Sequence, residues 1–569
     1  MTTGELGPIT AAPTPIRRLW HRSLDRYPSN PSRYLSLGIV VATTIVLYYQ
    51  LYLSGGVATA ILRNLNMSFT YYVNISVIGY LLGAAASWLA GLADRYGRAN
   101  IVTAGLGLVG LLCLVGLPNA HTKAAFLIIY VAIGFVEGII LVATPALIRD
   151  FSPQLGRASA MGFWTLGPVL GSLVVAAFVS GAGHRSWQDQ YRISGVIGLV
   201  VFAVALVGLR ELSPRLRDQL MVSRKDRELI EARAAGIDIE ESLRHPYRQM
   251  LRPDILLSAF AISVFLIIYY VAVGFFPVFF ETVFGYSQSR ANTLGDWFWA
   301  FDAGGLLLVG ALSDRIRVRK PFMVFGAVCA IASTTIFALK ATHPTTSYST
   351  FVVLLSCIAV SLALAFAPWM ASFTETVERR NPALIATGLA VWGLVIRIVI
   401  AVSVFFVPKV VTTATTLVQK GPAVKAVLAD PAPVGQTTIG KVATAVSANP
   451  VIVARLQKVS APPTAADKRF LVSAAKTLGP ANLAALVKPT PALGAALRTL
   501  TTDGPPVARA AADSPKQWRT FFFVGVGGEV VFIPLILLMA GFWDPRAARR
   551  AELEHDEWLE GELRKLRSG

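Results

Sequence analysis

Four ionisable side chains interrupt long apolar stretches of the chain, and they are Glu137, Asp302, Arg397 and Glu529. A charged group is costly in a hydrocarbon environment, so such residues in the middle of an apolar run are functional candidates. A carboxylate in this setting can take up and release a proton, and a guanidinium can hold an organic anion through paired hydrogen bonds. The sequence therefore predicts proton binding or anion binding at these positions.

The apolar stretches that hold these residues are long enough to cross a membrane as helices. We expect twelve spans, at 35–57, 71–89, 101–117, 124–148, 158–180, 193–209, 255–280, 292–312, 321–339, 350–373, 383–407 and 521–542. Of the 569 residues, 54% are hydrophobic and only 15% are charged, which leaves too little polar surface for a protein surrounded by water. The predicted fold class is an all-α membrane protein.

Charged segments divide the spans and set their orientation. The predicted organisation is a segment 1–34, a six-helix bundle 35–209, a linker 210–254, helices seven to eleven in 255–407, an insert 408–518, helix twelve in 519–543 and a tail 544–569. Lys and Arg collect in the first segment, the linker and every second short loop, which predicts that these parts and both termini are cytoplasmic. The insert is then extracytoplasmic. It carries 13 Lys and Arg against 4 Asp and Glu, and we expect either a small helical cap or a partly disordered arm.

Two turns between spans carry the same basic motif. AGLADRYGRAN at 90–100 lies between spans two and three, and GALSDRIRVRK at 310–320 lies between spans eight and nine. Each resembles the signature G-x-L-a-D-R-x-G-R-R of the major facilitator superfamily, which occurs once per half in that family. The matching residues are Asp94, Arg95, Gly97 and Arg98 in the first half and Asp314 and Arg315 in the second. Ala90 and Arg317 depart from the signature at two glycine positions.

This resemblance implies the facilitator fold, in which two six-helix bundles are related by a pseudo-two-fold axis. It also implies secondary transport by alternating access, with a site near the membrane midplane between the halves. In the family, the DR motif steadies the outward-open state.

Span five carries a second likeness. Its sequence GFWTLGPVLG contains Gly162, Gly167, Pro168 and Gly171, and it resembles the G-P-x-x-G motif of facilitator antiporters. The alternative is a small-residue face that packs against a neighbouring helix. Span eleven aligns with it through Gly388, Gly393 and Arg397, which supports an internal duplication. Drug antiporters carry an R-x-x-Q-G motif in span four, where this chain has Tyr130 and Ile133.

The resemblance also places the candidate residues, because spans one, four, seven and ten line the facilitator cavity most directly. Glu137 in span four is the first candidate for a proton-coupling or substrate-binding group, and the alternative is a structural Glu bonded to a hydroxyl. Asp302 and Arg397 form either an ion pair, fixed or remade during transport, or separate groups of which Arg397 binds an anion. Glu529 is assigned to packing or an oligomer contact. The cavity-lining candidates are Tyr48, Tyr49, Gln50, Tyr52, Tyr269, Tyr270 and Trp369.

Other function classes lack their sequence signals. The formal net charge is +19, but Lys and Arg lie in loops beside the membrane, so we expect the lipid bilayer, a proton and a small molecule as partners and no nucleic acid. Cys113, Cys329 and Cys357 lie in apolar runs, and we expect no metal, no cofactor and no enzyme activity. No ATP-binding G-x-x-x-x-G-K-[ST] motif is present.

We expect secondary, proton-coupled transport of a small organic solute, with an anionic metabolite as one option, by a multi-pass protein of a bacterial cell membrane. The alternatives are an exporter of amphipathic compounds, or a non-transporting receptor or scaffold that acts through the insert 408–518. The sequence leaves the substrate, the direction of transport, the coupling ion and the oligomeric state open.

Overall fold

The structure is a computed structural model of the chain. It describes residues 22–24, 26–87, 97–151, 156–181, 185–213, 246–316, 318–380, 385–456, 458–459, 463–539, 541–550, 553–554 and 557. Asp94 and Arg95, most of the linker 210–254 and most of the tail 544–569 lie outside these residues.

Six long helices form the first half of the molecule, one for each apolar run. They are α2 (Asn30–Gly56), α4 (Phe69–Ser87), α6 (Arg98–Leu111), α7 (Lys123–Phe151), α8 (Gly156–Gly181) and α9 (Trp187–Gly208). A π-helical turn η2 (Leu112–Gly116) and a 3-10 turn η3 (Leu117–Asn119) continue α6, and a short helix α3 (Ala58–Asn64) follows α2.

The second half repeats this arrangement. It contains α13 (Pro253–Phe265) and α14 (Ile267–Val283), which form one span interrupted at Leu266, and α15 (Gln288–Ile316), α16 (Lys320–Lys340), α17 (Tyr348–Arg380), α18 (Ile385–Val410) and α25 (Pro491–Ile536). A short helix α12 (Pro246–Met250) precedes α13. Ten helical segments of the described residues are long and apolar enough to cross a membrane, and α8 and α15 complete the set of twelve. The expected twelve-helix fold is confirmed.

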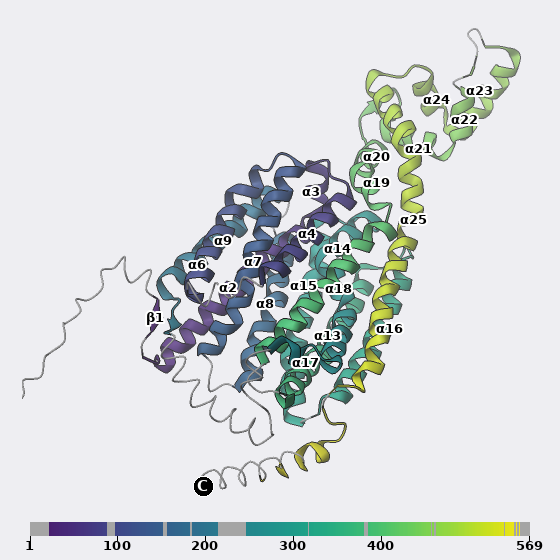
Figure 1. The fold of residues 1–569 in the computed structure, drawn as a ribbon. Helices are drawn as coiled ribbons and strands as arrows, with labels where there is room; N and C mark the ends of the chain where they lie inside the picture. The colour runs from purple at the N-terminus through teal and green to yellow at the C-terminus, as the bar shows by residue number, and fades with distance from the viewer. Residues whose placement is uncertain are drawn as a thin grey trace, which may run out of the picture.

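The two halves lie side by side, with the first half in purple and blue and the second in teal and green (Figure 1). They meet mainly where α8 packs against α15 and where α4 packs against α18. These contacts join the fifth helix of each half to the second helix of the other, as a pseudo-two-fold axis requires. Large apolar side chains such as Leu308 and Val207 stay 74% and 68% exposed on the outer helix surfaces. Lipid tails can cover such side chains at no cost.

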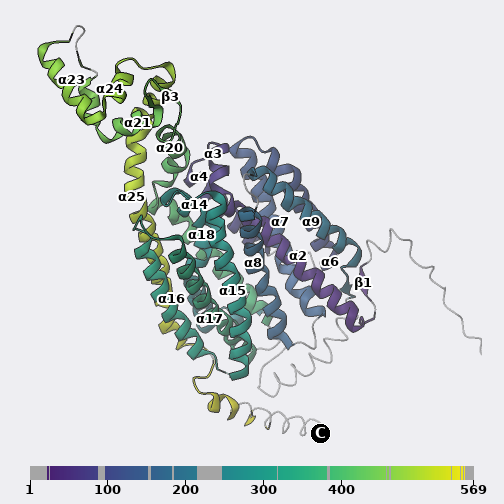
Figure 2. The same ribbon diagram turned by 180° about the vertical axis from the view of Figure 1, so that it is seen from behind.

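The insert is helical in the described residues. It holds α19 (Ala414–Gln419), α20 (Gly421–Leu428), α21 (Ile439–Ala448), α22 (Pro450–Leu456), α23 (Ala465–Leu478) and α24 (Pro480–Val487), with a small hairpin of β3 (Pro433–Val434) and β4 (Thr437–Thr438). It projects from one end of the bundle, which we call the insert face (Figures 1 and 2). Helix α25 has 46 residues and runs without a break from the insert into the twelfth span, across the expected boundary at 518.

The opposite end, which we call the terminal face, carries the described beginning and end of the chain (Figure 1). There, β1 (Ser23–Leu24) pairs in parallel with β2 (Glu211–Leu212), which follows the sixth span. Arg22 is buried and donates hydrogen bonds to Thr103 and to the carbonyl oxygens of Ala99 (3.5 Å) and Ala205 (3.4 Å). Its burial lowers the pKa of the Arg22 guanidinium from the usual value. Residues 22–24 are therefore fixed against the first half.

Candidate functional site

A cluster of tyrosines occupies the centre of the molecule between the two halves. One cavity there is lined by residues of α2, α4, α7, α14 and α18, including Tyr52, Tyr72, Tyr80, Tyr130 and Tyr270. The elements that provide them belong to both halves, so the cavity lies between the halves. The tyrosine rings offer apolar faces for a ring-shaped solute, and their hydroxyl groups offer hydrogen bonds.

Hydrogen bonds within the first half hold part of this cluster in place. Ser54 and Tyr130 bring their hydroxyl oxygens to 2.9 Å, and the Tyr72 hydroxyl donates to the Ser54 carbonyl oxygen at 2.9 Å. The ring centroids of Tyr48 and Tyr52, one turn apart on α2, are 5.3 Å apart. Sequence reasoning missed Tyr72 and Tyr80 as lining residues. It noted Tyr130 only because this tyrosine stands where drug antiporters have the arginine of their R-x-x-Q-G motif. This difference from the motif was the one sequence signal for Tyr130 as a lining residue.

Glu137 on α7 is 1% exposed and does not line the tyrosine cavity. Neither carboxylate oxygen has a hydrogen-bond partner among the described residues. It interacts electrostatically with Tyr48 and Tyr80. The hydroxyl-bonded structural role is not seen in the described part of the chain.

Arg397 approaches the same cluster from the other half. It lies on α18 and interacts electrostatically with Tyr48 and Tyr270. Tyr48 thus interacts electrostatically with both Arg397 and Glu137, which belong to different halves. Arg397 does not line the tyrosine cavity.

Asp302 belongs to a neighbouring region. It is 3% exposed on α15 and interacts electrostatically with Tyr269, whose ring lies 5.2 Å from that of Tyr270 and 5.0 Å from that of Trp299. No ion pair links Asp302 to Arg397 in the described residues, where both belong to the second half. Neither form of the expected pair is found there.

Three other candidates pack inside their own halves. Gln50 donates to the Ser194 carbonyl oxygen on α9 at 3.1 Å, and the Tyr49 ring lies 5.6 Å from Phe178 on α8. Trp369 is fully buried in the second half, where its indole N–H donates to Ser258 at 3.1 Å. None of the three lines the tyrosine cavity.

The glycines of span five bring two helices together. A Cβ atom at Gly167 would lie 2.5 Å from Thr44, and one at Gly171 would lie 2.6 Å from Tyr48 on α2. The Gly171 contact therefore lets α8 approach the helix that presents Tyr48. Pro168 lies inside α8 between them. Gly162 also lies in α8, outside the part for which side-chain surroundings are described.

The DR turns lie at the terminal face and differ between the halves. In the first, Gly97 has φ +92° and caps α6, while the Arg98 backbone N–H donates to Glu211 at 2.8 Å. Sequence reasoning missed the role of Glu211, although its RELSPR segment follows the sixth span.

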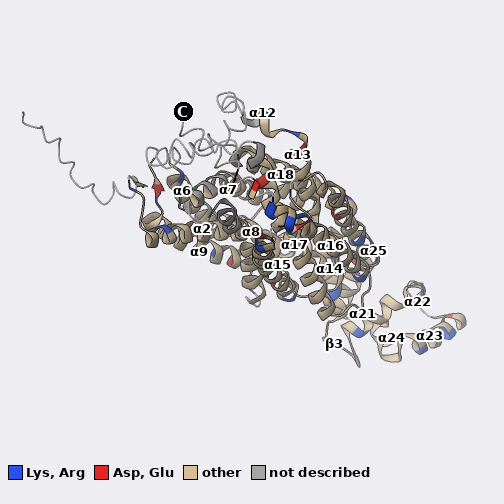
Figure 3. Cartoon of the chain, turned by 90° about the horizontal axis from the view of Figure 1, so that it is seen from below, with Lys and Arg blue, Asp and Glu red and all other residues tan. Residues whose placement is uncertain are grey.

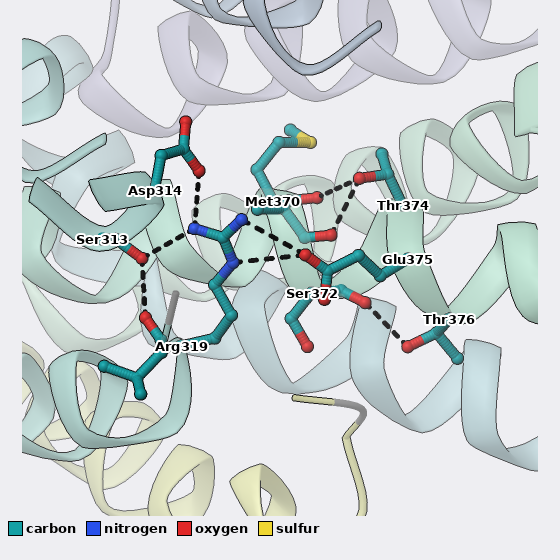
Figure 4. Close-up of polar contacts among 10 residues, drawn as sticks. Ser313, Asp314, Arg319, Met370, Ser372, Thr374, Glu375 and Thr376 are labelled. Carbon is teal, nitrogen blue, oxygen red and sulfur yellow. Dashed lines mark hydrogen bonds and ion pairs between the residues drawn. The ribbon is translucent and has the colours of Figure 1, made fainter. Parts of the chain in front are cut away.

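In the second half, Arg319 forms the centre of a charge cluster (Figure 4). It contacts Asp314 at 2.7 Å, Glu375 at 3.2 Å and the Ser313 hydroxyl at 2.9 Å. Arg315 is exposed. The view along the bundle from this face shows blue and red residues at the helix ends and on the insert (Figure 3).

The family model described as Major Facilitator Superfamily matches residues 10–404. The chain belongs to this superfamily. It is therefore a multi-pass membrane protein of a family that transports solutes and does not catalyse reactions. The match ends before the insert and before the twelfth span.

Relatives with known names support this assignment. "Probable anion transporter 3, chloroplastic" from Arabidopsis thaliana is 26% identical to this facilitator over 274 residues, which are 46% of this chain and 49% of that protein. The match thus spans about half the length of that relative. The "3-(3-hydroxy-phenyl)propionate transporter" of Escherichia coli (strain K12) is 24% identical over 320 residues, 54% of this chain and 72% of that protein.

Solved structures share the fold of this facilitator. A bacterial homologue of the human lysosomal transporter Spinster, inward-facing and occupied, superposes with a TM-score of 0.55 at 16% identity and covers 90% of this chain and 97% of that one. The D-xylose–proton symporter gives a TM-score of 0.51 at 14% identity, with 66% and 90% covered. At these identities the likeness is one of fold.

Proposed function

We propose that this facilitator carries a small aromatic organic anion, such as an aromatic carboxylate, together with a proton. The observation that supports this most directly is that Tyr48, whose ring lies 5.3 Å from that of the cavity-lining Tyr52, interacts electrostatically with both Glu137 and Arg397. The guanidinium would bind the carboxylate of the solute, and the tyrosine rings would stack against its ring. Glu137 would bind the coupling proton.

Arg397 and Glu137 would have different chemical roles. Arg397 presents a planar fork of N–H donors, whose geometry suits a carboxylate. Glu137 is buried without a hydrogen-bond partner among the described residues, so its charged form is costly and its neutral form is favoured. Releasing the proton is then favoured only when a change of state brings water to the carboxylate. That requirement couples proton release to alternating access.

Two relatives transport molecules of matching chemistry by name, an anion and a hydroxyphenyl propionate. The second combines a carboxylate with an aromatic ring, and those are the two features that the tyrosine cavity and Arg397 suit. The named substrates belong to those proteins, and they guide the choice of solutes for this one.

The basic residues of the linker and short loops favour a cytoplasmic terminal face and an extracytoplasmic insert face. The location would then be a cell membrane with both termini inside. Attaching a protease site to each terminus and treating sealed right-side-out vesicles would check this orientation, because neither site should be cut.

Uptake into proteoliposomes tests the role of Glu137. Radiolabelled aromatic carboxylates are offered with and without a pH gradient, and the parent protein should accumulate at least one of them only with the gradient. Glu137→Gln keeps the size of the side chain but cannot bind and release a proton. It should therefore lose accumulation and retain exchange of solute between the two sides. The matched control is Glu529→Gln, which changes a buried carboxylate bonded to Thr334 at 2.8 Å outside the site. Gradient-driven accumulation that persists in Glu137→Gln would contradict the proposed proton site.

The same vesicles test Arg397. Arg397→Ala removes a charge-assisted contact to the carboxylate, which corresponds to a rise in KM of roughly 10- to 100-fold. The effect should be absent for an uncharged amide analogue of the same solute. An equal loss for acid and amide would show that Arg397 supports the fold and does not bind the anion.

A further inference from the structure

The root of the insert joins the two halves at the insert face. Helix α19 follows α18 directly and packs against α25, both of the second half, and also against α3 and α4 of the first half. Three hydrogen bonds cross from α19 to the first half. The Phe69 backbone N–H donates to the Thr415 hydroxyl at 2.9 Å, the Gln419 amide donates to the Met67 carbonyl oxygen at 3.0 Å, and the Arg63 guanidinium donates to the Val418 carbonyl oxygen at 3.1 Å.

Other contacts fix α19 to its own half. The backbone N–H and the hydroxyl of Thr413 both donate to the Gln517 side chain on α25, at 3.2 and 2.8 Å. Gln517 in turn donates to the Thr412 hydroxyl at 3.0 Å, and Lys420 pairs with Asp503 on α25 at 3.0 Å. Because α25 continues into the twelfth span, α19 must move with the second half.

The same end of the bundle holds direct contacts between the halves. The Thr59 hydroxyl donates to Glu281 at 2.5 Å, and the Asn292 amide donates to the Gly56 carbonyl oxygen at 3.0 Å. The Ser180 hydroxyl donates to Asp296 at 2.8 Å. The insert face is therefore closed in this structure, and opening it requires all of these bonds to break.

We infer that α19 is a clamp, defined by residues 414–419, which holds the insert face closed and biases this transporter toward the state open at the terminal face. Here the insert adds a second set of bonds that lies outside the membrane-crossing helices. The clamp does not depend on the identity of the solute, so its test needs no substrate.

Distance measurements between spin labels test the clamp. The labels are attached at Ala124→Cys at the start of α7 and Thr345→Cys before α17, in a variant whose three native cysteines are replaced by alanine. Both positions are exposed at the insert face, one on each half. Double electron–electron resonance in liposomes then gives the populations with a closed and an open insert face, whichever way the protein is oriented.

Thr415→Val and Gln419→Leu each remove one bond of the clamp. A single hydrogen bond shifts an equilibrium by roughly fivefold, so each variant should raise the ratio of open to closed insert faces by about fivefold and the double variant by about 25-fold. The matched control is Thr416→Val, a neighbour on the same helix whose side chain makes no hydrogen bond in the described residues, and it should leave the ratio unchanged. A double variant with the same distance distribution as Thr416→Val would overturn the clamp. Unchanged distances would leave the proposed site between the halves unaffected, because transport assays report on it separately.

Discussion

The two DR turns occupy equivalent places in the two halves, and they are held by different means. In the first, a glycine with positive φ lets the backbone reach the buried Glu211, which accepts the Arg98 N–H. In the second, the side chain of Arg319 binds two carboxylates, Asp314 and Glu375. Among the described residues, the first turn is therefore tied to Glu211 through a backbone N–H, and the second through the side chain of Arg319.

The difference follows from what surrounds each turn. The first half has a partner segment, because β1 and β2 bring the start of the chain and the end of the sixth span beside the turn. The second half lacks the glycine, since Arg317 stands at its place in the sequence. A basic residue two positions later then provides the connection to α17. We expect the first junction to tolerate substitution less and the second to depend more on salt.

Gly97→Ala is expected to have the largest effect on this comparison. A Cβ atom would lie 2.5 Å from the Glu211 carboxylate, and φ +92° is unfavourable for any residue with a side chain. The free energy of unfolding should fall by about 3 kcal/mol. Titration with sodium dodecyl sulfate in mixed micelles measures it. Gly38→Ala on α2, where an added Cβ meets nothing within 4 Å, is the control and should be neutral or slightly stabilising. A loss below about 1 kcal/mol for Gly97→Ala would show that the turn adapts.

Arg319→Ala should have the next largest effect. It leaves Glu375 and Asp314 without their shared cation, and because both are partly exposed, water compensates for part of the loss. We expect a decrease of about 2 kcal/mol in the same titration. Arg315→Ala, which removes an exposed arginine of the signature itself, should cost less than about 0.5 kcal/mol. If the two variants were equally destabilising, Arg319 would not be the centre of the cluster.

Most of the fold could be predicted from the sequence, because hydrocarbon imposes long apolar helices and the repeated DR turn relates the two halves. The continuity of α25 could not. Pro505, Pro506 and Pro515 suggest breaks, yet all three lie inside that helix. Whether a helix continues through a proline depends on how packing satisfies the backbone groups around it. The sequence alone does not give that packing.

For the candidate site, the sequence indicated which residue types are involved. It did not indicate which residues contact one another. Depth in an apolar run identified Glu137 and Arg397, and the structure brings both near Tyr48. The same criterion selected four cavity-lining candidates on one helix, Tyr48, Tyr49, Gln50 and Tyr52. Adjacent residues on a helix point in different directions, so they cannot all face one cavity. An i to i+4 spacing selects Tyr48 and Tyr52, and this pair alone lies together. Arg319 was missed because it falls where the signature has only a generic basic residue.

Glu211→Gln should have the smallest effect and should define how the first junction works. The amide keeps an oxygen to accept the Arg98 N–H, so the geometry survives and only the charge on the acceptor is lost. We expect a decrease of about 1 kcal/mol, the difference between a charge-assisted and a neutral hydrogen bond. This decrease should persist at about 1 M salt because Glu211 is 5% exposed and screening acts mainly on exposed charges. Glu375→Gln is the matched change in the second half, where the carboxylate is 37% exposed, and its effect should shrink in the same salt. Equal salt dependence in the two variants would mean that both turns are held by surface electrostatics, and the contrast between a backbone junction and a side-chain cluster would then fail.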